Sequence, residues 1–173
     1  MEAIFALSQQ LGAGFKLVEY IFANRDDHLT DPYAVRLSPN DQFACRKAIR
    51  KLLGIPENDS PSNKPIPEFI KNEPEYAFNC STGRNSFAVT SNGRLLACLL
   101  MNEPSVQLGD DFKADWSKLI ELCDAVPTCV ECDTCAFRSI CKVCPAKLIG
   151  ETGSFNQKAP YLCEMTELMA SDY

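Results

Sequence analysis

The chain has 173 residues, among them ten cysteines and one histidine (His28), and its formal net charge is −6. This length suits one domain or two small ones, and 46% hydrophobic with 23% charged residues excludes a wholly disordered chain. The acidic balance lacks the basic footprint of nucleic-acid-binding proteins, and a single histidine excludes His-rich metal sites. We therefore expect no nucleic-acid partner.

The chain shows neither a membrane span nor a secretory signal. Its longest apolar runs, such as residues 94–101, are strand-sized and fall short of the roughly 18–20 residues that cross a membrane. An acidic residue at position 2 and the lack of a basic segment argue against a signal peptide. We expect a cytoplasmic protein with no membrane partner, in which dense cysteines indicate metal ligands before disulfides.

The first elements in chain order are a helix and a strand. Ile4, Leu7 and Leu11 form an apolar helical stripe, and Gly12 is well placed to end the helix. Residues 15–23 are β-branched and aromatic with alternating character, which predicts a strand buried on both faces.

A second helix and a connector follow. Ser38 is a candidate N-cap before Pro39, apolar residues continue over positions 43–53, and Gly54 ends the helix. Helix, strand and helix together resemble a slice of an α/β sheet or barrel. A proline-rich stretch then indicates a connector. The predicted organisation is residues 1–55, a connector over 56–74, and a second region over 75–173.

The second region reads as α+β. A short helix is expected over 67–72, and Asn92-Gly93 between apolar runs 86–90 and 94–98 predicts a β-hairpin. Residues 112–125 form an amphipathic pattern with Trp116 and Leu119 on the apolar face. A helical turn over 145–150 and a final short helix over 163–170 complete the prediction.

Nine of the ten cysteines lie between positions 80 and 163. Two thiolates on one tight turn can reach one metal, and five or more thiolates exceed what one tetrahedral ion accepts. The ligand set is all sulfur, which admits zinc or iron–sulfur clusters, and spacing alone does not choose between them. The dense part is Cys132-x2-Cys135-x5-Cys141-x2-Cys144, followed by Cys163.

The wider pattern resembles a known module. Cys80-x12-Gly93-x4-Cys98 followed by the dense part and Cys163 is similar to the seven-cysteine signature of the SPASM domain. That domain is the C-terminal extension of many radical S-adenosylmethionine (SAM) enzymes that modify peptides. The likeness covers roughly residues 75–170. One departure is the spacing between Cys141 and Cys144, one residue shorter than usual, so Cys129-x2-Cys132 offers an alternative register.

The resemblance implies two [4Fe-4S] clusters. When the family's ligands are matched to this sequence position by position, the second cluster takes Cys132, Cys135, Cys141 and Cys163, and the first takes Cys80, Cys98 and Cys144. The resemblance leaves the fourth ligand of the first cluster open. It is either Cys129 or Cys123, or the site has no fourth ligand and its exposed iron could bind substrate.

The same resemblance makes the N-terminal region the last part of a radical SAM partial barrel, with strand 17–22 and helix 39–53. The SAM-binding loop of these enzymes carries C-x3-C-x2-C, and no Cys-x3-Cys occurs in this chain. The loop is expected upstream of Met1, which makes the chain a fragment, a truncated reading frame or a split product. Alone it is not expected to cleave SAM.

The function implied is the auxiliary-cluster part of a radical SAM enzyme, such as one that matures sulfatases or ribosomal peptides. Expected partners are a peptide or protein substrate, a reductant such as flavodoxin or ferredoxin, and the barrel portion, with which SAM would bind. The alternative is a non-catalytic iron–sulfur or zinc protein that serves as an electron carrier or interaction module.

The remaining conspicuous residues have plainer interpretations. Cys45 and Cys123 lie on apolar helix faces and are expected in the core. We expect His28 in a solvated loop, Glu19 as a solvent-facing or paired carboxylate, and Trp116 as a packing anchor.

Overall fold

The computed structural model describes residues 1–16, 18, 20–22, 34–56, 77–78, 80, 82–138, 140–141 and 144–171. Within these residues the fold is α+β, with six helices and one three-stranded antiparallel sheet, which confirms the predicted class at this level. The predicted helix over 67–72 and nearly all of the connector lie outside them. The elements are α1 (Glu2–Gln10), α2 (Pro39–Leu52), β1 (Ala88–Val89), β2 (Arg94–Leu96), β3 (Ser105–Gln107), α4 (Phe112–Asp124), α5 (Val130–Asp133), α6 (Pro145–Thr152) and α7 (Pro160–Ala170).

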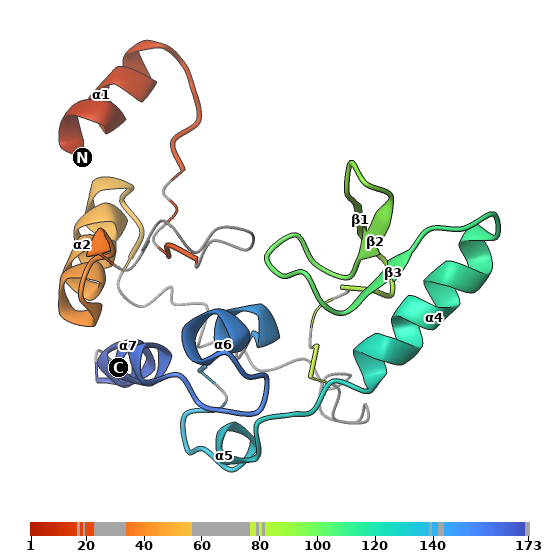
Figure 1. Ribbon diagram of the computed structural model, residues 1–173. Helices are drawn as coiled ribbons and strands as arrows, with labels where there is room; N and C mark the ends of the chain where they lie inside the picture. The colour runs from red at the N-terminus through yellow and green to blue at the C-terminus, as the bar shows by residue number, and fades with distance from the viewer. Residues whose placement is uncertain are drawn as a thin grey trace.

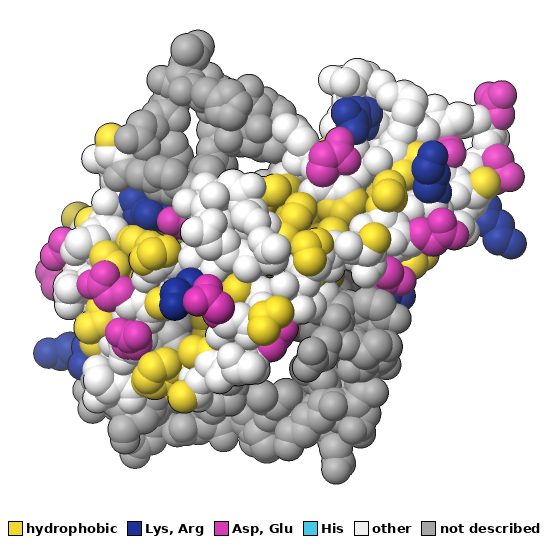
Figure 2. Space-filling view, turned by 60° about the horizontal axis from the view of Figure 1, so that its bottom comes forward, with side chains coloured by type: hydrophobic (Ala, Val, Ile, Leu, Met, Phe, Trp, Pro, Cys, Tyr) yellow, Lys and Arg dark blue, Asp and Glu magenta, His cyan; other side chains and the backbone are white. Residues whose placement is uncertain are grey.

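The elements fall into two halves with α6 between them (Figure 1). α1, α2 and α7 lie on one side, and the sheet with α4 lies on the other. Acidic side chains are spread over the face seen in Figure 2, in keeping with the net charge of −6. Among the described residues, no helix has both the length and the apolar character needed to cross a bilayer.

The helix predicted from Ile4, Leu7 and Leu11 is confirmed as α1. Gly12 follows it with φ +62°, a left-handed conformation that glycine adopts without strain, and the Ala13 N–H closes the end on Ser8 O at 2.9 Å. The apolar stripe is not buried, however: Ile4 is 66% exposed and Leu11 71% exposed. α1 therefore derives little of its stability from packing within the described residues.

The strand predicted over residues 15–23 is wrong where it is described. Residues 15, 16, 18 and 20–22 are in no strand, and Val18 is 72% exposed. The physical reason lies in a distant contact: the Tyr20 hydroxyl donates to Glu151 of α6, and the Tyr20 ring packs edge-on against Phe22. Within the described residues, the helix–strand–helix expected as a barrel remnant therefore contains its two helices and not its strand.

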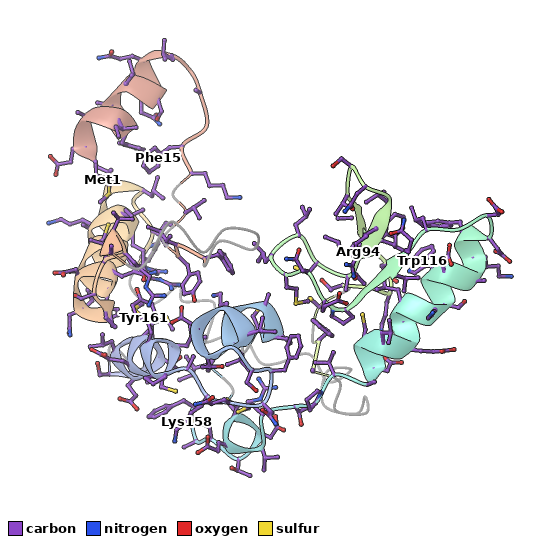
Figure 3. The ribbon with its side chains drawn as sticks, viewed as in Figure 1. Met1, Phe15, Arg94, Trp116, Lys158 and Tyr161 are labelled. Carbon is purple, nitrogen blue, oxygen red and sulfur yellow. The ribbon has the colours of Figure 1, made fainter. Side chains whose placement is uncertain are left out.

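The second predicted helix is confirmed as α2. Ser38 Oγ accepts the Asp41 N–H at 3.2 Å, Pro39 occupies the first turn, and Gly54 follows the end with φ +66°. α2 packs along α7, and Figure 3 shows Tyr161 between these two helices. The Tyr161 hydroxyl donates to Gln42 and to Leu37 O, the latter at 3.0 Å.

A buried ion pair fastens the N-terminal segment to the last two helices. Arg36 and Glu151 have side chains that are 10% and 8% exposed, and Arg36 Nη2 also donates to Glu151 Oε2 at 3.3 Å. The guanidinium of Arg36 lies 3.6 Å from the ring centroid of Tyr161, a cation–π contact. Arginine suits this position because its planar fork can pair with a carboxylate while its face stacks on an aromatic ring.

The predicted hairpin is confirmed as β1 and β2, which pair antiparallel with Ala88 opposite Leu96. Gly93 in its turn has φ +77°, a conformation that favours glycine. Sequence reasoning missed β3, which pairs with β2 through Leu95 opposite Val106. α4, predicted over 112–125, covers this sheet.

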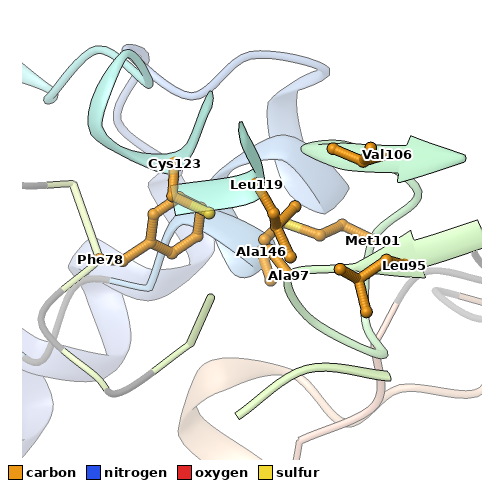
Figure 4. Packing of buried hydrophobic residues seen from close by; sticks show 8 residues of the cluster. All are labelled: Phe78, Leu95, Ala97, Met101, Val106, Leu119, Cys123 and Ala146. Carbon is orange, nitrogen blue, oxygen red and sulfur yellow. The ribbon is translucent and has the colours of Figure 1, made fainter. Parts of the chain in front are cut away.

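The main apolar core lies between the sheet, α4 and α6 (Figure 4). Leu95 and Leu119 are fully buried in it. Its buried members are Phe78, Leu95, Ala97, Met101, Val106, Leu119, Cys123 and Ala146.

We predict that Glu151→Ala lowers the free energy of unfolding by about 3 kcal/mol, because it leaves the buried Arg36 guanidinium without its counter-ion. Urea unfolding measures this loss. The exposed pair Arg84–Asp124 is the control, and Asp124→Ala should cost less than about 1 kcal/mol. Equal losses in the two variants would contradict the anchoring role of the buried pair.

Candidate metal centres

All ten cysteines lie within the described residues and all are free thiols. Eight of them fall into two groups of candidate metal ligands. The first cysteine group comprises Cys80, Cys98 and Cys144, and Cys123 lies beside it. The second cysteine group comprises Cys129, Cys132, Cys135, Cys141 and Cys163.

The first cysteine group joins the hairpin to α6. Cys98 lies two residues after the end of β2, and Cys144 is the N-cap residue of α6. Both side chains pack, partly buried, against the main apolar core. The Leu100 N–H points at the Cys98 sulfur at 3.5 Å, the type of contact that stabilises sulfur charge in metal–thiolate sites.

The charges of the other two thiols of this group act on Cys98. Burial raises the pKa of Cys98, the charges of Cys144 and Cys80 raise it further, and the Leu100 N–H opposes the shift. Neighbouring thiolates disfavour ionisation because like charges repel. A metal cation bound between them would remove that repulsion.

The second cysteine group is built by short local turns. Cys132 lies in α5, and its N–H donates to Cys129 O at 2.9 Å, while the Cys135 N–H donates to Cys132 O at 3.2 Å. The Cys141 N–H ends a further turn on Phe137 O at 2.8 Å. Cys163 comes from the first turns of α7, whose N-terminal end favours an anionic ligand.

The thiols of the second group also raise one another's pKa. Burial, a hydrogen bond with the Cys129 thiol and the charges of Cys163 and Cys141 raise the pKa of Cys132 to about 12. Burial raises the pKa of Cys163, the charges of Cys141 and Cys135 raise it further, and Lys158 opposes the shift. Lys158 itself pairs with Glu131 at 3.2 Å.

The electrostatic partners of the thiols agree with the division expected from spacing. Cys80 and Cys144 act on Cys98, and Cys141 acts on both Cys132 and Cys163, with Cys129 as an additional member of the second group. Their role as ligands stays a prediction. Cys129, considered for the first cluster, lies instead beside Cys132.

The donor set suits a thiolate-bound metal in chemistry, and the second cysteine group also has the number. Four cysteines are what a structural zinc ion or a [4Fe-4S] cluster requires. Among the residues that the structure describes, no three Cys, His, Asp or Glu side chains converge closely enough to hold an ion as they stand. Binding would therefore draw the thiols of each group closer together.

The other conspicuous residues fall outside this chemistry or outside the description. Cys123 is 3% exposed, as its core assignment predicted, whereas Cys45 on α2 is only half-buried. Trp116 is confirmed as a packing residue: its ring lies 5.1 Å from that of Phe87. Glu19 and His28 lie outside the described residues.

The chain has a similar protein in an archaeon. An uncharacterized protein of Archaeoglobus fulgidus is 32% identical over 97 residues, a match that covers 53% of this chain and 23% of that protein. The chain therefore spans about a quarter of the length of the relative it matches. No family model matches the chain, and no solved structure matches it.

The thiol chemistry predicts how the metal-free protein responds to pH. The protonated Cys132 contributes stability that is fully present below the unfolded thiol pKa of about 8.5. It is lost as the pH rises from there toward the folded pKa of about 12. We expect the free energy of unfolding to fall between pH 8.5 and 10.5, approximately, and to fall less in Cys132→Ser.

Urea unfolding at the two pH values, with chelator and reductant present, measures this difference. Cys45→Ser is the matched control, because Cys45 lies in α2 and belongs to neither cysteine group. An identical pH dependence in wild type and Cys132→Ser would show that thiol crowding at Cys132 does not limit stability.

Proposed function

We propose that this chain binds two [4Fe-4S] clusters and acts as the auxiliary-cluster part of a radical SAM enzyme that modifies a peptide or protein. One observation carries the proposal. Cys98 interacts electrostatically with Cys80 and Cys144, and Cys132 and Cys163 both interact with Cys141, so the cysteines of the SPASM-like spacing fall into the expected two groups, the second of which also contains Cys129. The agreement supports the proposal for the first group in particular, because Cys80, Cys98 and Cys144 are far apart in the sequence.

In this proposal the residues around the first cysteine group have specific roles. A bound cluster supplies an electron relay or an anchoring iron. The Leu100 N–H stabilises charge on the Cys98 sulfur, and the start of α6 presents Cys144 where partial positive charge favours thiolate. The apolar core behind Cys98 and Cys144 excludes water from that side of the site.

The length of the archaeal relative agrees with an enzyme that has further parts. The match covers 23% of it, so that protein is more than four times as long as the matched segment. In our proposal the remaining barrel portion supplies the SAM site, and the exposed apolar stripe of α1 contacts it. A reducing cytoplasm, a peptide substrate and a flavodoxin- or ferredoxin-type reductant belong to the same proposal.

A zinc-binding interaction module is the second candidate. It is favoured by the lack of any Cys-x3-Cys in the chain and by an all-thiol ligand set that equally suits tetrahedral zinc. Zinc would serve as a structural tie and would carry no electrons.

Anaerobic reconstitution with iron and sulfide separates the two candidates. We expect about eight irons and eight sulfides per chain, with visible charge-transfer absorption. Preferential uptake of zinc without sulfide, when both metals are offered, would contradict the iron–sulfur proposal.

The assignment to separate clusters has its own test. We predict that Cys135→Ala abolishes one cluster and leaves about four irons per chain, because Cys135 belongs to the second cysteine group only. Cys45→Ala is the control and should keep the full complement. Retention of both clusters in Cys135→Ala would contradict the ligand assignment.

A further inference from the structure

We propose that Cys129 and Cys132 form a reversible disulfide, and that this bond controls whether the second cysteine group can bind metal. Cys129 is the thiol that the proposed function leaves unused, because the second cysteine group has four candidate ligands without it. The control of metal binding rests on the proposed function, whereas the disulfide itself does not.

The backbone between the two cysteines forms one tight turn. The Cys132 N–H donates to Cys129 O at 2.9 Å, and the Asp133 N–H donates to the same oxygen at 3.0 Å. A turn that is closed between residues i and i+3 brings its two end Cα atoms within about 7 Å of each other. Disulfides join cysteines whose Cα atoms lie about 4.4–6.8 Å apart. The turn therefore brings the two cysteines into the range that a disulfide spans.

The two thiols also face each other. The Cys132 thiol is hydrogen-bonded with the Cys129 thiol, so both sulfurs point toward the same space. Independently of that hydrogen bond, Cys132 packs against the small buried apolar cluster to which Cys129 belongs. A disulfide would therefore replace a contact that the two side chains already make.

Cys135 is the competing partner, because it lies three residues from Cys132 on the other side. The Cys135 N–H closes a similar turn on Cys132 O, at 3.2 Å. The Cys135 side chain is exposed, however, and its charge acts on Cys163, whereas the thiol in contact with Cys132 is that of Cys129. Side-chain direction therefore favours Cys129 over Cys135 as the partner.

The half-buried Cys132 is the residue of the pair that an external disulfide reaches first, because Cys129 is only 3% exposed. The Cys132 thiolate attacks a small-molecule disulfide such as glutathione disulfide, forms a mixed disulfide and expels one thiolate. The Cys129 thiolate then attacks the Cys132 sulfur and expels the second thiolate. The chain thus loses two electrons and two protons, which convert the external disulfide into two thiols.

The disulfide and the metal compete for the Cys132 sulfur. A metal binds a cysteine as thiolate, and a sulfur in a disulfide has no thiolate to offer. Oxidation leaves the second cysteine group one ligand short of the four that a zinc ion or a [4Fe-4S] cluster requires. The first cysteine group shares no residue with the pair, so only one of the two proposed centres responds to oxidation.

Peptide mapping of the oxidised chain tests the disulfide. The metal-free full chain is treated with glutathione disulfide at about pH 8.5, where thiolates are accessible, and the remaining thiols are alkylated. Cleavage after Glu131 separates the peptide that contains Cys129 from the one that contains Cys132. We expect mass spectrometry to find these two peptides joined, and reduction to separate them. Unlinked, alkylated peptides would overturn the proposal.

Single variants identify the two sulfurs. Cys129→Ser and Cys132→Ser should each lose the link between the two peptides. Cys135→Ser is the matched control, because Cys135 lies at the same spacing from Cys132 and its removal should keep the link. Persistence of the link in Cys129→Ser, or its loss in Cys135→Ser, would overturn the assignment.

The control of metal binding has a separate test. The full chain reconstituted anaerobically with iron and sulfide is treated with the same glutathione disulfide, and we expect loss of the link, because metal holds Cys132. Equal formation of the link in the loaded and metal-free chains would overturn this control. A chain that takes up no metal would contradict the proposed function instead, and the linked peptides of the metal-free chain would still establish the disulfide.

Discussion

The burial of neighbouring thiols, which disfavours their ionisation, is the constraint on which the rest of this structure depends. Burial and neighbouring sulfurs raise the pKa of Cys98, Cys132 and Cys163, so these groups are favoured as neutral thiols when no cation is near. A protein gains little from gathering such groups for packing alone. Metal binding converts the same arrangement into a favourable one, because the cation compensates the sulfur charge that ionisation creates.

The cysteines of the two groups lie on elements that are far apart in the sequence. The hairpin presents Cys98 beside Cys144 of α6, while α5 and α7 carry Cys132 and Cys163 of the second group. The Arg36–Glu151 pair then holds the N-terminal segment against α6. Because α6 begins at one cysteine group and receives this ion pair at its other end, it connects the two halves seen in Figure 1.

Local chemistry explains which elements were predictable. Ser38 and Gly54 bound α2, and Asn92-Gly93 turns the hairpin, through interactions within a few residues of each signal. The strand predicted over 15–23 was wrong because alternation in sequence does not supply a pairing strand; the described residues there contact a distant helix instead, through the Tyr20 hydroxyl and Glu151, 131 residues away. β3 was missed because its three residues depend on pairing with β2.

The same distinction applies to the candidate site. The short spacings predicted the turns around Cys132, Cys135 and Cys141. The likeness to the SPASM signature added Cys80, Cys98 and Cys163 as candidate metal ligands. Cys123 was a candidate for the fourth ligand, but helical periodicity placed it on an apolar face, and the structure confirms it as a core residue that is 3% exposed.

The central claim is that two separate sets of thiols each hold one cluster. Native mass spectrometry of the anaerobically reconstituted full chain tests it most directly, because it weighs metal and sulfide in the intact protein. We predict a final species with about eight irons and eight sulfides, reached through a species with about four of each. A final species with a single cluster, or one with zinc and no sulfide, would contradict the claim.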